Sequence, residues 1–452
     1  MSNYNPGLQY VYKCTYVAAV GGLLFGYDTA VVAGAIGFIR ARYELSPAMT
    51  GWVASCALIG CVIGAMFSGL LSDRIGRKKV LMISAIAFTV SSLGIMLPLS
   101  LDFFIFFRLI GGIGIGIASM LSPLYISEIA PAPIRGRLIS IYQMGIVVGI
   151  LLIYFVNAGI AGLNNDAWNI EAGWRWMFGS GILPSGLFIY LLLSVPESPR
   201  WLVQKHRLSE AAAILDKVNG PEKAKLELSA IQSSMQEESG SFSSLLKPGL
   251  RYAMIIGVIL AILSQVTGIN AIMYYAPEIF KSSGDGSSSA LLETVLVGVI
   301  NLLFTVVAIK YVDKWGRKKL LLIGSGGMTV CLGLVGLAFH YNLHQGPLIL
   351  IAILAYISFF AISLGPLTFV VVAEIFPTQV RGRAMSVAIF FLWIAVFVVS
   401  QTFPMLQSSI GEARTFWIYM TMSLIAFVFV KRMVPETKGR SLEEIQQFWK
   451  IK

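Results

Sequence analysis

An acidic residue inside an apolar segment is the feature of this sequence with the clearest chemical consequence. Asp28 lies about midway along one apolar run, and Arg108 opens another directly behind the segment 103–107. An ionisable side chain in hydrocarbon costs at least ~2.5–3.5 kcal/mol, so this carboxylate needs a partner or a function. A structural ion pair is one interpretation. The other is a proton site, in which Arg108 holds Asp28 ionised until protonation releases the pair.

A second set of acids and bases lies in the short segments between apolar runs. One interpretation is a solvated face whose charges only set the orientation of the chain. The other is a gate, in which ion pairs between the ends of spans hold one side shut. A single exposed pair contributes about 0–1 kcal/mol, so such a gate requires a network. The candidate gate residues are Asp73, Arg77, Glu128, Arg135, Glu197, Arg200, Asp313, Arg317, Glu374, Arg381, Arg383 and Glu436.

The composition indicates that these residues sit in a membrane protein. Of 452 residues, 56% are hydrophobic and 13% are charged, whereas soluble proteins have about 45–50% and about 25%. This excludes a soluble enzyme, a disordered chain and a disulfide scaffold. The four cysteines and three histidines are scattered, so no metal or cofactor is expected. No nucleophile–base pair or nucleotide loop is present, so the protein is not expected to be an enzyme.

Apolar runs of about 20 residues, the length of a spanning helix, occur twelve times. They are too long for barrel strands and do not alternate with period two. The predicted fold is therefore an all-α membrane protein with twelve transmembrane helices. We expect a six-helix half at 1–195, a cytoplasmic helical linker at 196–250, a second six-helix half at 251–432 and a cytoplasmic tail at 433–452. The spans are predicted at 15–39, 51–71, 79–99, 103–126, 138–160, 174–194, 252–276, 290–311, 320–340, 347–373, 384–406 and 414–431.

The distribution of Lys and Arg predicts the orientation. Basic runs follow the second, fourth, eighth, tenth and twelfth spans, while the alternate loops are poorer in Lys and Arg. Basic loops stay in the cytoplasm, so both termini are expected on that side. The net charge of +11 belongs to this pattern and does not indicate a nucleic-acid partner.

The two halves repeat one another. Asp73–Lys79 returns as Asp313–Lys319, and Glu128–Pro131 returns as Glu374–Pro377. A third pair, Pro196-Glu197-Ser198 and Pro435-Glu436-Thr437, keeps a similar offset of about 240 residues. Such parallel repeats are typical of transporters with a site between two halves.

These motifs identify the chain as similar to the sugar porters of the major facilitator superfamily over essentially its whole length. The closest likeness is to bacterial D-xylose–proton symporters, through the stretch from Tyr274 to Phe280 and through Val297–Asn301. The other matching motifs are Gly21–Asp28, the two Asp…Gly-Arg-Lys loops, the two Glu…Arg-Gly-Arg loops, Pro196–Arg200, Gly268–Asn270, Tyr274–Pro277 and Pro435–Gly439.

The resemblance implies roles for particular residues. It favours proton coupling through Asp28 and Arg108, and it favours the gate interpretation of the loop charges. It implies substrate binding by Gln265, Asn270, Tyr274, Asn301 and Trp393. Helix–helix hydrogen bonds for the amides and an interfacial place for the indole are the structural alternatives. The family's xylose carriers have other residues at four sugar-contact positions, which are Ile150, Ser264, Leu364 and Leu392 here.

The predicted function is proton-coupled import of a monosaccharide: a pentose, a hexose or a related polyol. An uncoupled facilitator, a carrier of a less polar solute and a non-transporting sugar sensor are the alternatives. The expected partners are the sugar or polyol, protons and the lipid bilayer, and the protein is expected to be a monomer in a bacterial inner membrane. The four substituted contact positions leave the identity of the sugar open.

Overall fold

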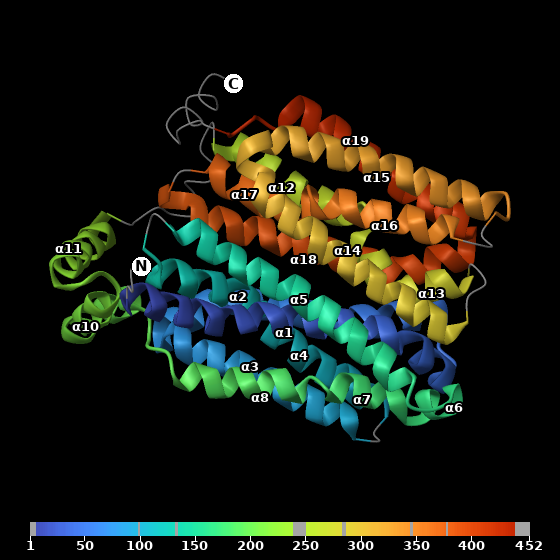
Figure 1. Ribbon diagram of the computed structural model, residues 1–452, viewed down its shortest axis with the longest axis horizontal. Helices are drawn as coiled ribbons and strands as arrows, with labels where there is room; N and C mark the ends of the chain where they lie inside the picture. Colours follow the sequence, from blue (N-terminus) through green and yellow to red (C-terminus); the bar gives the residue numbers. More distant parts are fainter. Residues whose placement is uncertain are drawn as a thin grey trace, which may run out of the picture. The chain divides into compact units, whose positions relative to one another are not determined.

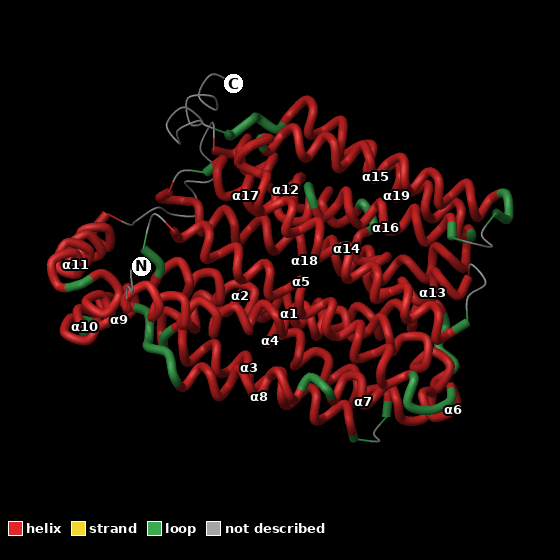
Figure 2. Tube along the Cα trace, in the orientation of Figure 1, coloured by secondary structure: helices red, strands yellow, loops and turns green. Residues whose placement is uncertain are grey.

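The computed structural model describes residues 6–97, 100–131, 134–237, 250–282, 286–343, 347–376 and 378–438. Within these ranges the chain is helical and contains no strand (Figure 2). Twelve helical segments are long and apolar enough to span a membrane, and each contains or closely overlaps one of the predicted spans. The segments are Gly7–Tyr43, Pro47–Ile75, Arg77–Met96, Leu101–Ile129, Arg135–Ala161, Asp166–Leu193, Leu250–Ser282, Ser289–Val312, Arg317–His340, Leu348–Ile375, Gly382–Ile410 and Glu412–Met433.

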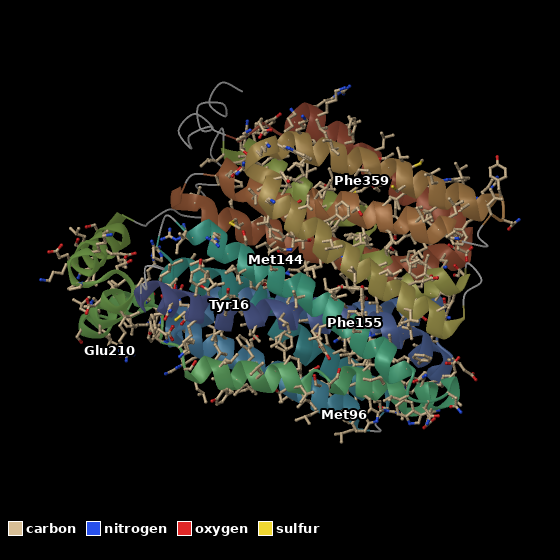
Figure 3. All side chains as sticks on the ribbon, viewed as in Figure 1. Tyr16, Met96, Met144, Phe155, Glu210 and Phe359 are labelled. Atoms are coloured by element: carbon tan, nitrogen blue, oxygen red, sulfur yellow. The ribbon has the colours of Figure 1, made fainter. Side chains whose placement is uncertain are left out.

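Several spans carry large apolar side chains that are exposed (Figure 3). Tyr16 is 57% exposed, and Phe155 is 54% exposed. A membrane tolerates such exposure, because hydrocarbon removes the penalty that water imposes on apolar surface. Closed backbone hydrogen bonding explains the helices themselves, since lipid offers no partner for a free N–H or C=O.

Contacts divide the chain into two compact units. The first consists of Met1–Asp28, Gly60–Gly149 and Gly179–Ser239, and the second consists of Thr29–Ile59, Ile150–Phe178 and Gly240–Lys452. Three long helices therefore contribute to both units: α1 (Pro6–Tyr43), α2 (Pro47–Ile75) and α5 (Arg135–Ala161). The predicted division at 195 and 250 follows the order of the spans, and it stays a prediction.

The first unit is built around the beginning of α1. It also contains α3 (Arg77–Met96), α4 (Leu101–Ile129) and α8 (Ile182–Leu193), and α3 packs along both α4 and α8 (Figure 1). Close packing of α1 on α5 depends on glycine: a methyl group at Gly26 would overlap the carbonyl oxygen of Ile146. Small residues let membrane helices approach in this way, which fixes the turn of α1 that carries Asp28.

The predicted linker is helical where it is described. It folds as α9 (Pro199–Gln204), α10 (Leu208–Asn219) and α11 (Pro221–Glu237), and α10 packs against α11 (Figure 1). A small apolar core joins them, made by Trp201, Leu202, Val203, Ala211, Leu215, Ala224 and Ile231. The cytoplasmic place of this linker stays a prediction, and its residues 238–249 lie outside the described part of the chain.

The second unit contains the first part of the sixth span and all of the last six spans. The sixth span is made of α6 (Asp166–Trp168), the π-helical η2 (Asn169–Gly173), α7 (Trp174–Gly179) and α8. The remaining helices are α12 (Leu250–Val266), α13 (Ile269–Ser282), α14 (Ser287–Trp315), α15 (Arg317–His340), α16 (Leu348–Ala361), α17 (Leu364–Ile375), α18 (Thr378–Ile410) and α19 (Glu412–Met433). Helices α15 and α19 run side by side (Figure 1).

Among the described residues, two of the last six spans are broken near their middles. The seventh span stops at the end of α12 and restarts as α13 after Gly268, whose φ is 95°. The tenth span breaks between α16 and α17, at Ile362 and Ser363. Broken helices inside a membrane free backbone carbonyls, and such breaks occur where a span lines a binding site.

Tyrosine hydroxyls donate hydrogen bonds to backbone carbonyls that the prolines and the span breaks leave without an N–H partner. Pro277 has no N–H for the carbonyl of Met273, four residues earlier, and the Tyr154 hydroxyl donates to that oxygen at 2.7 Å. Pro404 likewise frees the carbonyl of Ser400, which accepts from Tyr275 at 2.9 Å. At the seventh-span break, Tyr356 donates to Thr267 O at 3.0 Å. Each bond satisfies a group that lipid would leave unpaired.

Removing one of these hydroxyls is expected to destabilise the protein. Tyr154→Phe keeps the ring but strands the buried Met273 carbonyl, at a cost of about 1–3 kcal/mol. Thermal unfolding of the detergent-purified protein should show a lower midpoint for Tyr154→Phe and for Tyr275→Phe. Tyr16→Phe is the control, because that ring is exposed. A midpoint equal to wild type in both variants would contradict this account of the broken spans.

Candidate functional site

Asp28 and Arg108 form an ion pair inside the first unit. The Arg108 Nη1 atom lies 2.9 Å from Asp28 Oδ2 and 3.4 Å from the Asp28 carbonyl oxygen. Arg108 is 1% exposed and Asp28 is 8% exposed. The pair joins α1 to α4 in the apolar part of both spans, so a change in charge at either residue alters how these helices hold together.

The surroundings of Asp28 contain a third helix. Gly111 lies one turn beyond Arg108, and a methyl group there would be 3.6 Å from Asp28 Oδ2 and 2.6 Å from the Ser91 hydroxyl of α3. The buried Ser91 hydroxyl has no hydrogen-bond partner among the described residues. The carboxylate is therefore packed among α1, α3 and α4, with Arg108 as its charged partner.

A charged cluster holds the start of α3. The Arg77 guanidinium donates from Nε to Glu128 Oε2 at 3.0 Å and from Nη1 to Asp73 Oδ1 at 2.9 Å. Glu197 accepts from the backbone N–H groups of Arg77 and Lys78 at 2.9 and 3.1 Å. A carboxylate at a helix N-terminus satisfies free N–H groups and interacts favourably with the helix dipole.

The second unit repeats this arrangement at the start of α15. Arg317 Nη2 donates to Glu374 Oε1 at 2.9 Å, and Glu436 accepts from the backbone N–H groups of Arg317 and Lys318. The glycine before each helix has positive φ, 103° at Gly76 and 86° at Gly316. A side chain on either glycine would collide with the capping carboxylate. The sequence repeat is thus also a repeat of hydrogen bonds.

The remaining predicted gate residues are placed less directly. The Arg135 guanidinium donates to Ala130 O at 3.3 Å, and Arg200 is exposed at the start of α9. Arg383 is half-buried on α18. The side chains of Asp313 and Arg381 lie outside the described part of the structure. The ion pairs given above each join span ends of the same half, so pairing across the halves stays a prediction.

Two of the predicted substrate residues meet at the break in the seventh span. The Asn270 amide donates to Gln265 Oε1 at 2.6 Å, and the Gln265 amide donates to Ser264 Oγ at 3.0 Å. Ser264 in turn donates to Ala261 O at 2.7 Å. This chain of bonds fixes the orientation of both amides while each keeps further hydrogen-bonding capacity.

The other three predicted substrate residues are buried on neighbouring helices. Tyr274 on α13 is 4% exposed, Asn301 on α14 is 8% exposed and Trp393 on α18 is 4% exposed. Helix α13 contacts both α14 and α18. The structure therefore gathers all five residues on adjoining helices of the second unit, but it shows a direct hydrogen bond only for Gln265 with Asn270 among the pairs described.

Apolar side chains occupy three of the four substituted sugar-contact positions. Leu392 lines a small crevice with Ala261 of α12 and Thr368 of α17. Leu364 is fully buried at the break in the tenth span, and Ile150 is half-buried on α5. Ser264 is the polar exception, because it bonds Gln265. Three of the four substituted positions therefore carry apolar side chains, and the fourth, Ser264, is bonded to the amide pair.

The sequence of this chain matches the pattern of the family described as sugar (and other) transporter over residues 14–449. It is 45% identical over 443 residues to the arabinose-proton symporter of Bacillus subtilis, covering 98% of this chain and 96% of that protein. It is 41% identical over 474 residues to the D-xylose-proton symporter of Escherichia coli, with the same coverage. The chain belongs to the sugar transporter family.

Solved structures of one relative agree with this assignment. The xylose transporter XylE from E. coli, in a partially occluded inward-open conformation, matches with a TM-score of 0.86 and 40% identity over 96% of this chain and 100% of that chain. XylE bound to 6-bromo-6-deoxy-D-glucose, a major facilitator superfamily proton:xylose symporter, matches at 0.81 and 41% over 99% and 100%. The prediction of a twelve-helix major facilitator fold is confirmed.

Sequence inspection missed two features of this sugar transporter. It treated Glu197 and Glu436 as members of a charge network, whereas each caps the helix that follows its half's Gly-Arg-Lys motif. Their repeated Pro-Glu setting was the available signal. It also missed the tyrosines that bond freed carbonyls, for which Pro277 and Pro404 were the only sign.

The amide pair is expected to be needed for substrate binding. Gln265→Ala and Asn270→Ala each remove one oriented amide and strand polar groups of the substrate, at about 1–3 kcal/mol per lost bond. Binding of D-xylose and L-arabinose to purified protein, measured by calorimetry, should weaken about tenfold or more in each variant. Thr421→Ala, an exposed polar change on α19, is the control. Wild-type affinity in both amide variants would place the site elsewhere.

Proposed function

We propose that this protein is a secondary active transporter that imports a monosaccharide together with a proton by alternating access. The buried Asp28–Arg108 pair carries the proposal, because a charge pair in two apolar spans is costly unless it serves the mechanism. The relatives support it: an arabinose-proton symporter and a D-xylose-proton symporter share 45% and 41% identity with this chain.

The proton step uses atoms that the structure describes. A proton arriving at Asp28 Oδ2 neutralises the carboxylate that Arg108 Nη1 contacts at 2.9 Å. The charge-assisted bond then becomes weaker, and α1 and α4 lose part of what holds them together. Loss of the proton to the other side of the membrane restores the pair. Protonation therefore changes the relative stability of two arrangements, as an alternating carrier requires.

The amide pair suits a sugar hydroxyl, which both donates and accepts hydrogen bonds. The side-chain amides of Gln265 and Asn270 share one hydrogen bond, and each keeps further donors and acceptors for a ligand. The apolar residues Leu364 and Leu392 offer no hydrogen bond nearby. We infer a pentose, a hexose or a related polyol, including a deoxy sugar or a cyclic polyol that has fewer hydroxyls to satisfy.

An uncoupled facilitator is the second candidate. The same apolar residues favour it, as does a 37% identical relative named glucose facilitated diffusion protein, from Zymomonas mobilis. The buried carboxylate at Asp28 opposes it, since a facilitator has no use for a proton site. The two candidates differ in one measurable property, which is accumulation of sugar against its gradient.

We infer the setting of the protein from its charges. The basic loops of both halves, including Lys78 and Lys318, support a cytoplasmic location for them and for both termini in a bacterial inner membrane. Lipid is the partner of the exposed apolar side chains, and the protein works as a monomer.

Asp28→Asn separates the candidates. The amide fixes a neutral, protonated-like side chain, so binding and exchange between preloaded vesicles should survive because neither needs net proton movement. Accumulation of D-xylose or L-arabinose driven by an imposed pH gradient should vanish. If Asp28→Asn vesicles still concentrate the sugar, the proton site is not Asp28. If wild-type vesicles never concentrate either sugar while exchanging it, the protein is a facilitator.

The loop charges are proposed to form a cytoplasmic gate, in addition to capping helices. Glu128 lies at the end of α4 and Arg381 near the start of α18, in different halves, and we infer that both of these ends are cytoplasmic. Neutralising either is expected to favour inward-facing states and to increase cysteine labelling from the cytoplasmic side. Glu210→Gln is the control, because Glu210 pairs with Arg207 on the exposed surface of α10 (Figure 3). Unchanged labelling in Glu128→Gln and Arg381→Gln would reduce these charges to orientation signals.

A further inference from the structure

Helix α13 carries two predicted substrate residues and one acidic residue on a single face. Asn270, Tyr274 and Glu278 are four residues apart, which places them in one row along the helix. The helical conformation is interrupted between α12 and α13 at Gly268, whose φ is 95°. Its position must therefore be set by contacts with other helices.

The far end of α13 is bound to the end of α1 by charge. Arg40 Nη2 lies 2.5 Å from Glu278 Oε2, and Lys281 Nζ lies 3.4 Å from Glu278 Oε1. The Glu278 side chain is 11% exposed, against 51% for Arg40 and 28% for Lys281. A nearly buried carboxylate thus has two cations, and Arg40 is the one that comes from another helix.

The shape of α1 fits this contact. A methyl group at Gly37, one turn before Arg40, would overlap the Glu278 carboxylate, so the missing side chain makes room for it. The Lys281 ammonium also lies 5.3 Å from the ring centroid of Phe38. Three residues of the same α1 turn therefore contact the last turn of α13.

We propose that Arg40 and Glu278 are positioning residues for substrate binding, because their ion pair holds α13 against α1 and so keeps Asn270 beside Gln265. The inference rests on the proposed function of the amide pair. Two hydrogen bonds hold the middle of α13: Tyr154 donates to its Met273 carbonyl, and its own Tyr275 donates to a carbonyl of α18. The ion pair fixes its end, about two turns beyond Asn270.

A neighbouring ion pair provides the comparison. Arg42 Nε lies 3.2 Å from Glu171 Oε2, but these side chains are 42% and 65% exposed. That pair does not involve α13. Exposed pairs of this kind change an equilibrium by at most about fivefold and often not at all. Arg42→Gln therefore controls for the loss of a charge from the same end of α1.

The test measures substrate affinity and the position of α13 separately. Exchange of D-xylose and L-arabinose in proteoliposomes gives KM and the maximal rate. A Ser400→Cys reporter, in a background without Cys14, Cys56, Cys61 and Cys331, gives the position, because Ser400 is buried and its carbonyl is bonded by Tyr275 of α13. Labelling with a membrane-impermeant maleimide reports when α13 moves away.

We expect Arg40→Gln and Glu278→Gln to raise KM about two- to fivefold with little change in the maximal rate, and to increase labelling by a similar factor. Gly37→Ala should do the same with all charges intact, whereas Gly159→Ala on α5, which faces open space, should not. In a Lys281→Gln background, the swap Arg40→Glu with Glu278→Arg should restore KM and labelling to within about twofold.

Several results would overturn the proposal. Wild-type labelling in Arg40→Gln and Glu278→Gln would show that the pair does not position α13. Increased labelling without a change in KM would show that the position of α13 does not matter for binding. If Arg42→Gln raised KM and labelling as much as Arg40→Gln does, the effect would come from the loss of a charge and not from the pair with Glu278. If neither sugar is exchanged by wild type, the proposed substrate class fails, and labelling alone still decides whether the pair positions α13.

Discussion

The ion pair between Asp28 and Arg108 is the interaction on which the account depends. Two charges that are 8% and 1% exposed in apolar spans are stable together, but breaking the pair leaves a buried charge without its partner, which is strongly destabilising. Proton binding neutralises Asp28 and leaves the Arg108 cation with the neutral carboxyl and the Asp28 carbonyl oxygen as partners, so the contact between the two helices weakens. A helix contact in the membrane thereby becomes sensitive to protons, which is the property that a proton-coupled carrier needs.

Backbone satisfaction in lipid constrains the rest of the second unit. A broken span is useful at a binding site, since it turns polar groups toward the ligand, yet each break or proline frees a carbonyl. The hydroxyls of Tyr154, Tyr275 and Tyr356 bond these oxygens. The same bonds link α5, α13, α16 and α18, so the helices that carry the amide pair are also held by the groups that satisfy their breaks.

Much of this was predictable from sequence, because hydropathy and repeats are local signals. The twelve spans follow from apolar run length, and the paired clusters around Arg77 and Arg317 follow from repeated motifs. Contacts between distant helices were not predictable. Pro277 indicates a freed carbonyl at Met273, but nothing near it identifies Tyr154 as the donor. Likewise, Glu278 is visible as an acid, whereas its pairing with Arg40 depends on where α1 ends.

The most direct test of coupling is to follow protons during sugar entry. Wild-type protein in weakly buffered proteoliposomes, with the membrane potential held at zero, would receive external D-xylose or L-arabinose while external pH and internal sugar are recorded. The account predicts that the outside becomes more alkaline as sugar enters, in proportion to the amount transported, and that Asp28→Asn abolishes the pH change. Sugar entry through the wild type at constant external pH would contradict it.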